Sequence, residues 1–282
     1  MTQHSPALSA RGLSVGYDRT PIVSELDLEI EAGRITALIG PNGSGKSTLL
    51  KGLARVLPPL AGHVELAGRD IRRISSRDVA RELGFLPQSP LAPEGITVAE
   101  LVRRGRHPHD RLFSRNTMGE AAAVAEAMLL TGVSEYAHRP VTALSGGQRQ
   151  RAWIAMVLAQ RTPTLLLDEP TTFLDIAHQI DVLELLLELN REHGKTIVIV
   201  LHDLEQAAAY ADTIVALTAG AIAASGPPQE VVTERFLADV FGLTARVIPD
   251  PDTGSPLVLP RGRRSRSAAE DSPSAHPTQE IS

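Results

Sequence analysis

Short apolar runs recur along the chain and predict the strands of a sheet. Residues 35–39, 83–87, 164–167 and 196–201 are rich in Ile, Leu or Val, and each run has the length of a strand rather than a helix. Residues 22–30 differ, because leucine and isoleucine alternate there with acidic residues in period two. Such alternation is typical of a strand with one buried and one exposed face. The pattern therefore predicts buried strands, preceded by half-exposed strands near the N-terminus.

Helices are predicted mainly in the middle of the chain, from about residue 89 to 145. Two capping boxes, at 97–100 and 117–120, place a Thr three residues before a Glu and mark helix starts. Residues 176–192 carry leucines at helical spacing and end at a His-Gly stop, and residues 229–241 have a helical pattern too. We therefore expect a helical region between the strands.

The composition narrows the possible functions. The chain has 282 residues, 43% hydrophobic and 22% charged, which suits one large or two small globular domains. Its net charge of −5 disfavours a general nucleic-acid binder, and the lack of cysteine excludes disulfides, thiol catalysis and Cys-based metal sites. We see no signal-peptide pattern and no apolar run long enough to span a bilayer. We expect a cytoplasmic protein whose membrane role comes through a partner.

The C-terminal stretch, residues 249–282, is rich in Pro, Ser, Arg and charge, and we expect it to be disordered. It contains a basic cluster at 261–266. Such a cluster can contact anionic lipid or RNA, but a solvated tail is the commoner role of a charge run. The ordered domain is accordingly predicted to span residues 8–242.

A glycine-rich segment between an apolar run and a helix start matches the P-loop pattern. It comprises Gly40, Pro41, Asn42, Gly43, Ser44, Gly45, Lys46, Ser47 and Thr48. The glycines let backbone N–H groups curl around phosphate oxygens, and the following helix N-terminus favours negative charge. Lys46 is placed to reach the β- and γ-phosphates, and the Ser47 hydroxyl to ligate Mg²⁺. The segment predicts a nucleotide site.

Two apolar runs end in residues that suit the chemistry of a bound nucleotide. The run at 164–167 ends in Asp168 and Glu169, where one acid can hold the Mg²⁺ shell and the other can polarise an attacking water. The run at 196–201 ends in His202, which can meet a γ-phosphate at the ligand edge of a parallel sheet. Outside such a context, a lone histidine there would be structural.

Three further features stay open on the residues alone. Ser145, Gly146, Gly147 and Gln148 lie directly before a helix predicted at residues 149–159. Small residues directly before a helix are typical of an anion-binding helix N-terminus, but a plain loop with a serine cap explains the segment equally well. Tyr17 can stack on an adenine ring or can be an ordinary packed aromatic of a strand. Gln88 lies in a Ser- and Pro-rich loop, where a glutamine is usually only solvated.

Taken in order, the motifs over residues 8–242 resemble the nucleotide-binding domain of ATP-binding cassette (ABC) proteins. The resemblance implies an α/β P-loop NTPase with a RecA-like parallel-sheet core and an N-terminal antiparallel β-subdomain. It also implies an α-helical subdomain inserted at about 89–145. Residues 40–48 then correspond to Walker A, residues 165–169 to Walker B and residues 144–148 to the family signature Leu-Ser-Gly-Gly-Gln.

The resemblance implies roles for single residues, with ATP as substrate and Mg²⁺ as cofactor. Glu169 corresponds to the catalytic base and His202 to the switch histidine that stabilises the γ-phosphate and water. Gln88 corresponds to the Q-loop glutamine, which serves catalysis and the metal. Ser47 and Asp168 would hold the ion.

The resemblance also implies a second copy as partner, in a head-to-tail dimer that closes over two ATP molecules. Ser145 and Gly147 of one copy would contact the γ-phosphate held by Lys46 of the other, and Gly146 and Gln148 belong to the same nucleotide-binding segment. Asp175 belongs to the D-loop (Leu174-Asp175). Tyr17 falls where the family stacks its adenine.

Within the family the chain is similar to importer ATPases, whose permease is a separate chain. The spacing from Lys46 to Asp168 leaves no room for a long coiled coil, which argues against chromosome- and repair-type members. Residues 171–176 (Thr-Thr-Phe-Leu-Asp-Ile) and 104–109 resemble cassettes of iron(III)-siderophore importers. We expect ATP-driven uptake of such a complex, with the protein held at the cytoplasmic face of the membrane by permease subunits that dock around Gln88. A substrate-binding protein would be an indirect partner, and nucleic acid none.

Two alternatives remain. Related importer cassettes serve haem and cobalamin, and other importers carry polar amino acids or metal ions. A soluble ABC ATPase without a transport role, such as an assembly or repair factor, would also lack a membrane span of its own.

Overall fold

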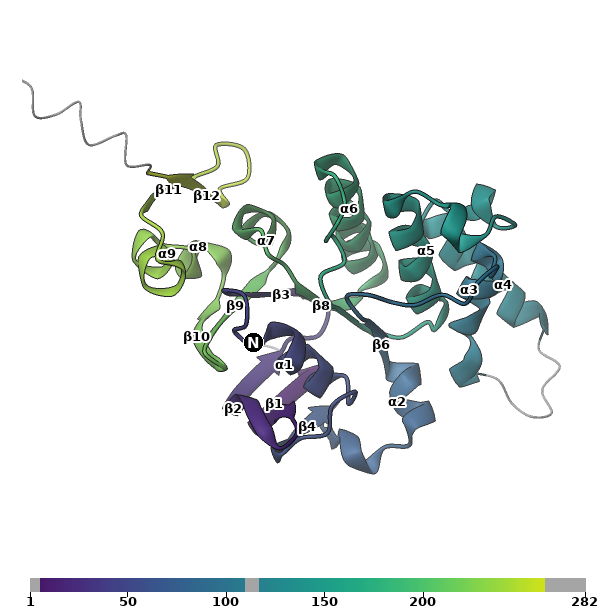
Figure 1. The fold of residues 1–282 in the computed structure, drawn as a ribbon, viewed down its shortest axis with the longest axis horizontal. Helices are drawn as coiled ribbons and strands as arrows, with labels where there is room; N and C mark the ends of the chain where they lie inside the picture. The colour runs from purple at the N-terminus through teal and green to yellow at the C-terminus, as the bar shows by residue number, and fades with distance from the viewer. Residues whose placement is uncertain (1–5, 110–116, 262–282) are drawn as a thin grey trace, which may run out of the picture.

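Six strands form the central sheet (Figure 1), in the order β10–β9–β3–β8–β7–β6. Their bounds are Ala221–Gly226 (β10), Thr213–Thr218 (β9), Ile35–Ile39 (β3), Thr196–Val200 (β8), Thr164–Leu167 (β7) and Leu83–Leu86 (β6). β10 runs antiparallel to β9, and the other neighbours are parallel. β3, β7 and β8 are buried along their whole length, as their apolar runs predict. The computed structural model describes residues 6–109 and 117–261.

A second, antiparallel sheet precedes and flanks this core, in the order β2–β1–β4–β5. Its strands are Leu8–Tyr17 (β1), Thr20–Ile30 (β2), Ala61–Leu66 (β4) and Arg69–Asp70 (β5). In β2, Leu26, Leu28 and Ile30 are buried and the residues between them are exposed, which confirms the period-two prediction. Helix α1 (Lys46–Leu53) packs its leucines into the apolar core that the two sheets share. The P-loop is thus held between both sheets.

Eight further α-helices occur in the described ranges. They are α2 (Ser76–Glu82), α3 (Val98–Arg104), α4 (Thr117–Leu130), α5 (Gly146–Ala159), α6 (Ile176–His193), α7 (Leu204–Tyr210), α8 (Pro228–Val231) and α9 (Glu234–Phe241). Short 3-10 turns lie at Ile71–Arg73, His107–His109, Ser134–Tyr136 and Val141–Ala143. None of the helices between residues 6 and 109 or 117 and 261 combines the length and hydropathy that a membrane crossing needs.

Helices α3, α4 and α5 gather at one end of the molecule (Figure 1) and form the helical region that the sequence predicts. Thr97 caps α3 and Glu100 closes the capping box, as expected. The second predicted capping box lies at the start of α4, where the Thr117 side chain falls outside the described residues. The helical region extends beyond residue 145, because α5 packs against α3 and α4. The signature therefore stands at the start of a helix of this subdomain.

A proline-broken turn at His107–His109 joins the helical region to the rest of the molecule. The carbonyl oxygen of Pro108 accepts hydrogen bonds from Nε of Arg77 (2.9 Å) and Nε of Arg81 (3.1 Å), both on α2. On its other side, the turn reaches the end of α5, where His109 Nε2 donates to the carbonyl oxygen of Gln160 at 2.6 Å. The turn thus links α2 to α5. We call the contact of Arg77 and Arg81 with the Pro108 carbonyl the arginine clasp.

The C-terminal region corrects one expectation from the sequence. Residues 245–260 form a hairpin of β11 (Ala245–Pro249) and β12 (Pro256–Pro260), although disorder was expected from residue 249. Ala245 and Val258 are buried in the main core, and β12 packs against α7. The Pro- and Ser-rich composition conceals a short apolar strand at 256–259, and buried apolar area holds it in place. The rest of the expected tail, residues 262–282, lies outside the described residues.

Candidate functional site

The glycine-rich loop between β3 and α1 turns where only glycine fits. Gly40, Gly43 and Gly45 have φ angles of 143°, 78° and 102°. A Cβ atom on Gly40 would lie 2.1 Å from the carbonyl oxygen of Leu217 on β9, closer than any side chain can approach. The loop therefore runs against the sheet edge and delivers its backbone N–H groups to the start of α1. This arrangement is an anion-binding concavity.

Lys46 is the first residue of α1 and is almost fully buried, with 5% of its surface exposed. Its Nζ atom donates to the carbonyl oxygens of Gly40 (2.9 Å) and Pro41 (3.0 Å), so the side chain curls back over the loop. Burial lowers the pKa of Lys46, and the nearby carboxylates of Glu169 and Asp168 oppose that shift. A buried ammonium group held over the loop is placed to bind anionic oxygens.

Ser47 and Asp168 meet across the loop. The Ser47 hydroxyl donates to Oδ1 of Asp168 at 2.7 Å, and Asp168 is only 1% exposed at the end of β7. Burial raises the pKa of Asp168, while the Ser47 hydrogen bond opposes the rise. Within the described ranges, the other carboxylate oxygen, Oδ2, and the Ser44 hydroxyl are buried without a hydrogen-bond partner. Buried polar atoms left unpaired in this way point to a missing ligand.

These oxygen groups fit Mg²⁺. Mg²⁺ is usually bound through one or two carboxylates, waters and substrate phosphates rather than by an all-protein cage. Accordingly, the part of the chain that the structure describes holds no group of three or more His, Cys, Asp or Glu residues suited to a metal. The predicted third ligand, Gln88, has its amide directed toward Glu169 instead. Ser47 and Asp168 are thus the pair best placed to hold the ion.

Glu169 is the centre of a second cluster. It follows Asp168 at the end of β7, is 9% exposed, and has a positive φ of 52°, a strained conformation that turns its side chain out of the strand direction. Its Oε1 atom lies 2.7 Å from Nε2 of His202, and its Oε2 accepts from Nε2 of Gln88 at 2.5 Å and from the Thr172 hydroxyl at 3.1 Å. The structure thus brings together all three residues predicted to be catalytic.

The signature begins α5 and does not reach the P-loop of the same chain. Ser145 is the N-cap, its hydroxyl accepts from the backbone N–H of Gln148, and the Gln148 side chain returns to the Ser145 N–H. In residues 6–109 and 117–261, no hydrogen bond or ion pair links the signature to residues 40–48. The signature and the P-loop of this chain are therefore separate segments.

Two other predicted nucleotide contacts lie at the surface. Tyr17 is 46% exposed at the end of β1, with its hydroxyl 3.5 Å from Nζ of Lys51 on α1. The ring is thus not packed in the core, and its exposure beside α1 favours the stacking interpretation. Asp175 caps α6 and accepts from the backbone N–H and the Nδ1 atom of His178, at 2.9 and 2.6 Å. These hydrogen bonds from His178 lower the pKa of Asp175.

Comparison with known proteins agrees with this geometry. Residues 23–172 match the family model for the ABC transporter ATPase domain, described as "ABC transporter". The ferric enterobactin transport ATP-binding protein FepC of Escherichia coli is 51% identical over 95% of this chain and 99% of its own. The chain belongs to the ABC transporter family.

Other relatives extend the likeness over nearly the whole cassette. The achromobactin transport ATP-binding protein CbrD of Dickeya dadantii is 53% identical over 91% of this chain and 96% of its own. Among solved structures, a metal-chelate type ABC transporter in an inward-facing conformation has a TM-score of 0.79 and 28% identity, covering 93% of this chain and 99% of that one. A dimeric bacterial ABC cassette has a TM-score of 0.69 and 26% identity, covering 78% of this chain and 98% of that one. The cassette is an ATP-binding ATPase of this family.

Sequence reasoning missed two residues of the cassette that contact predicted site residues. Thr172 binds Glu169, and His178 binds Asp175. Both lie within three residues of a predicted site residue, inside the Thr-Thr-Phe-Leu-Asp-Ile stretch or just after it. The spacing could have found them. In both cases a side chain that can donate a hydrogen bond follows a carboxylate by three residues, at a turn or helix start.

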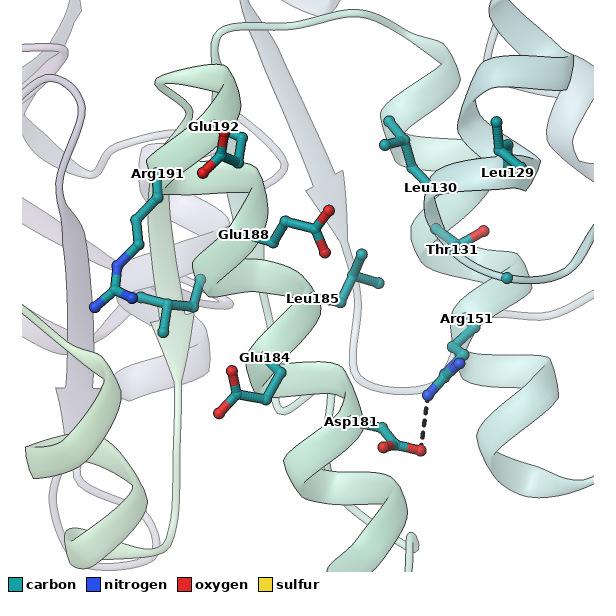
Figure 2. Close-up of a pocket in the computed structure, with 12 residues that line it drawn as sticks. Leu129, Leu130, Thr131, Arg151, Asp181, Glu184, Leu185, Glu188, Arg191 and Glu192 are labelled. Carbon is teal, nitrogen blue, oxygen red and sulfur yellow. Dashed lines mark ion pairs between the residues drawn. The ribbon is translucent and has the colours of Figure 1, made fainter.

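A separate hollow of about 490 Å³ lies between α6 and the ends of α4 and α5 (Figure 2). Its walls carry Leu129 and Leu130 on one side and the acidic residues Glu184 and Glu188 on the other. None of the predicted site residues lines it. The hollow is therefore separate from the predicted site at the P-loop edge of the sheet.

Proposed function

We propose that this cassette is the ATP-hydrolysing subunit of an importer that takes up iron(III)-siderophore-type complexes through separate permease subunits. The observation that carries the catalytic part is the meeting of Lys46, the Ser47–Asp168 pair and the Glu169 cluster at one edge of the sheet. Together they offer a cationic side chain for the phosphates, two candidate metal ligands and a candidate general base.

In the proposed reaction, Lys46 and the loop N–H groups bind the β- and γ-phosphates, and Ser47 and Asp168 would hold Mg²⁺. Mg²⁺, where Ser47 and Asp168 would hold it, would supply positive charge beside the phosphates. Glu169 orients and deprotonates the attacking water. His202 and Gln88 keep the Glu169 carboxylate in place through the contacts seen in the structure. Tyr17 stacks on the adenine.

We propose that the working form is a head-to-tail dimer in which each ATP lies between two copies. The signature of one copy (Ser145, Gly146, Gly147 and Gln148) faces the γ-phosphate held by Lys46 of the other, with Asp175 at the same interface. The helix start at Ser145, which within the described ranges makes no hydrogen bond to its own P-loop, supports this arrangement because the helix dipole favours an anion there. Binding then closes the dimer, and hydrolysis reopens it.

The cargo is inferred from the relatives. Those named for siderophore transport, including the petrobactin import protein FpuD of Bacillus anthracis, are 46–53% identical. The hemin import proteins HmuV of Streptomyces coelicolor and Rhodococcus jostii are 46% and 42% identical. Siderophore-type cargo is therefore the first candidate, and haem the second. The cassette would be peripheral, held at the inner face of the cell membrane by its permease, with a substrate-binding protein as indirect partner.

The test is purification of the chain from detergent-solubilised membranes, followed by identification of what comes with it. The proposal expects a polytopic permease, and ATPase activity of the reconstituted complex that rises with a ferric-siderophore-loaded binding protein. If only a haem-loaded binding protein raises the ATPase activity, the cargo is haem instead. A chain that stays without any membrane partner and hydrolyses ATP in response to a soluble assembly factor would overturn the importer function.

A further inference from the structure

The imidazole ring of His178 lies directly on the second glycine of the signature. A Cβ atom built on Gly147 would lie 2.3 Å from Cδ2 and 2.8 Å from Cγ of His178. Carbon atoms in contact are normally 3.5–4.0 Å apart, so the ring occupies the volume that any side chain at 147 would need. A side chain at position 147 therefore needs the His178 ring to move away.

The same ring is tied to the D-loop. Nδ1 of His178 lies 2.6 Å from Oδ1 of Asp175, the oxygen that also accepts the backbone N–H of His178 at 2.9 Å. The backbone N–H alone satisfies the helix cap, so the ring is not needed to start α6. The ring instead fixes the distance between the Asp175 carboxylate and the backbone of Gly147.

The D-loop is braced from a second side, toward the switch histidine. Nε2 of Gln179 donates to the carbonyl oxygen of Leu174 at 3.1 Å, and Nε2 of Gln206 donates to Oε1 of Gln179 at 2.7 Å. Gln206 lies in α7, which begins two residues after His202. Contacts therefore run without a break from α7 through the D-loop and His178 to the signature.

A second contact joins α5 and α6 one turn further along. Arg151 and Asp181 form an ion pair at 2.7 Å, which Figure 2 shows at the edge of the hollow. Both side chains are 30–50% exposed, so solvent screening leaves this pair little energy of its own. The contact between the His178 ring and buried Gly147 is the closer approach of α5 and α6.

We propose that His178 is a positioning residue that holds the signature and the D-loop of one subunit as a single unit facing the ATP of the partner subunit. The inference rests on the proposed function, because it requires the head-to-tail dimer in which these segments face the partner's ATP. The ring acts through Asp175 and Gly147 and does not itself touch the nucleotide held in its own chain. Loss of the link lets the two segments move independently and weakens capture of the partner's ATP.

Three substitutions separate the two contacts of the ring. His178→Asn keeps a donor at the Nδ1 position and an atom at the Cδ2 position. His178→Phe keeps the ring but removes the donor to Asp175, and His178→Ala removes both. If His178 only fills space, Phe behaves like the parent; if it links the two segments, Phe is impaired and Asn is not. Asp181→Asn, which breaks only the exposed ion pair, is the control.

The functional readout uses the full-length chain in a Glu169→Gln background, where ATP-driven dimers accumulate. The ATP concentration for half-maximal dimerisation, followed by size-exclusion chromatography with light scattering, should rise about fivefold for Phe and Ala and stay within about twofold for Asn and the control. ATP binding to the monomer, measured by equilibrium dialysis, should be unchanged in all four. Phe at the parent value would overturn the positioning role.

A second readout does not depend on dimerisation. In a double-mutant cycle, Gly147→Ala should lower the melting temperature of the nucleotide-free chain, and adding His178→Ala should recover part of that loss, because the methyl group then occupies the vacated space. Additive losses would contradict the Gly147–His178 contact. If the Glu169→Gln chain never dimerises, the proposed dimer fails, and with it the functional role of His178. The cycle would still report whether the contact exists.

Discussion

The Nε2 atom of His202 lies 2.7 Å from Oε1 of Glu169, at the adjacent carboxyl ends of β8 and β7. Two residues 33 positions apart in the sequence thus meet because their strands are parallel neighbours in the sheet. Glu169 is nearly buried, and its remaining carboxylate oxygen is bound by Gln88 and Thr172. The carboxylate is therefore held in one orientation before any substrate arrives, which is what a general base requires.

Replacing Glu169 by Gln should separate binding from hydrolysis. The amide keeps the shape and can still bond to its neighbours, but it cannot take a proton, so turnover should fall by at least about 100-fold. ATP affinity, measured by equilibrium dialysis, should change little, and dimers should accumulate with ATP. Lys46→Ala is the matched comparison, because it should instead weaken ATP binding itself. Wild-type turnover by the Gln variant would remove Glu169 from the role of base.

Thr172 should matter for turnover through its hydrogen bond to Glu169 Oε2. Thr172→Val has nearly the same shape but lacks the hydroxyl, so we expect kcat to fall about five- to tenfold, with KM for ATP nearly unchanged. Thr172→Ser keeps the hydroxyl and should retain most activity. A rise in KM with constant kcat in the Val variant would instead indicate a role in nucleotide binding.

Asp168→Asn should raise the melting temperature of the nucleotide-free protein and weaken its stabilisation by MgATP. The pKa of Asp168 is raised by burial, so its charged form is disfavoured in the folded protein. The sign follows from linkage: a carboxyl with a raised folded-state pKa favours folding at low pH and loses that contribution as pH rises. At neutral pH the nucleotide-free Asn variant should therefore melt higher than the parent.

The same variant should lose the stabilisation that Mg²⁺ and ATP confer together. Differential scanning calorimetry of both proteins, with and without MgATP and with EDTA, checks both halves of the prediction. Unchanged stabilisation by MgATP would show that Asp168 does not hold the ion. A lower melting temperature without ligand would contradict the burial argument.

Much of the grouping of the candidate residues could be predicted from the sequence because the motifs are local. A strand, a glycine loop and a helix start are contiguous in residues 35–53, and Asp168 and Glu169 directly follow a strand. What it could not predict are contacts set by three-dimensional packing, such as His178 on Gly147. The C-terminal hairpin was missed for a different reason, because the composition of 249–260 resembles a tail and its burial depends on a surface offered by α7.

The arginine clasp should hold the helical subdomain against α2. Arg77 and Arg81 donate to the same Pro108 carbonyl, so either alone can partly satisfy it, and single Ala variants should be mild. The double variant leaves that carbonyl without both donors, and we expect a loss larger than the sum of the singles. Arg73→Ala, on the neighbouring 3-10 turn, is the control. Urea denaturation measures the loss, and strict additivity would show that the two donors act independently.

The C-terminal hairpin should be part of the folded cassette rather than an appendage. Val258 is 7% exposed and belongs to the main core, whereas its neighbour Leu259 is 46% exposed on the same strand. Val258→Asp would bury a carboxylate without a partner, so the free energy of unfolding should fall by about 2–4 kcal/mol. Leu259→Asp differs by one position and faces solvent, so its effect should stay within about 0.5 kcal/mol. Because β12 packs on α7, which follows His202, the Val258 variant should also lower turnover under conditions where it remains folded. Equal stability of the two variants would mean that the hairpin does not dock on the core in solution.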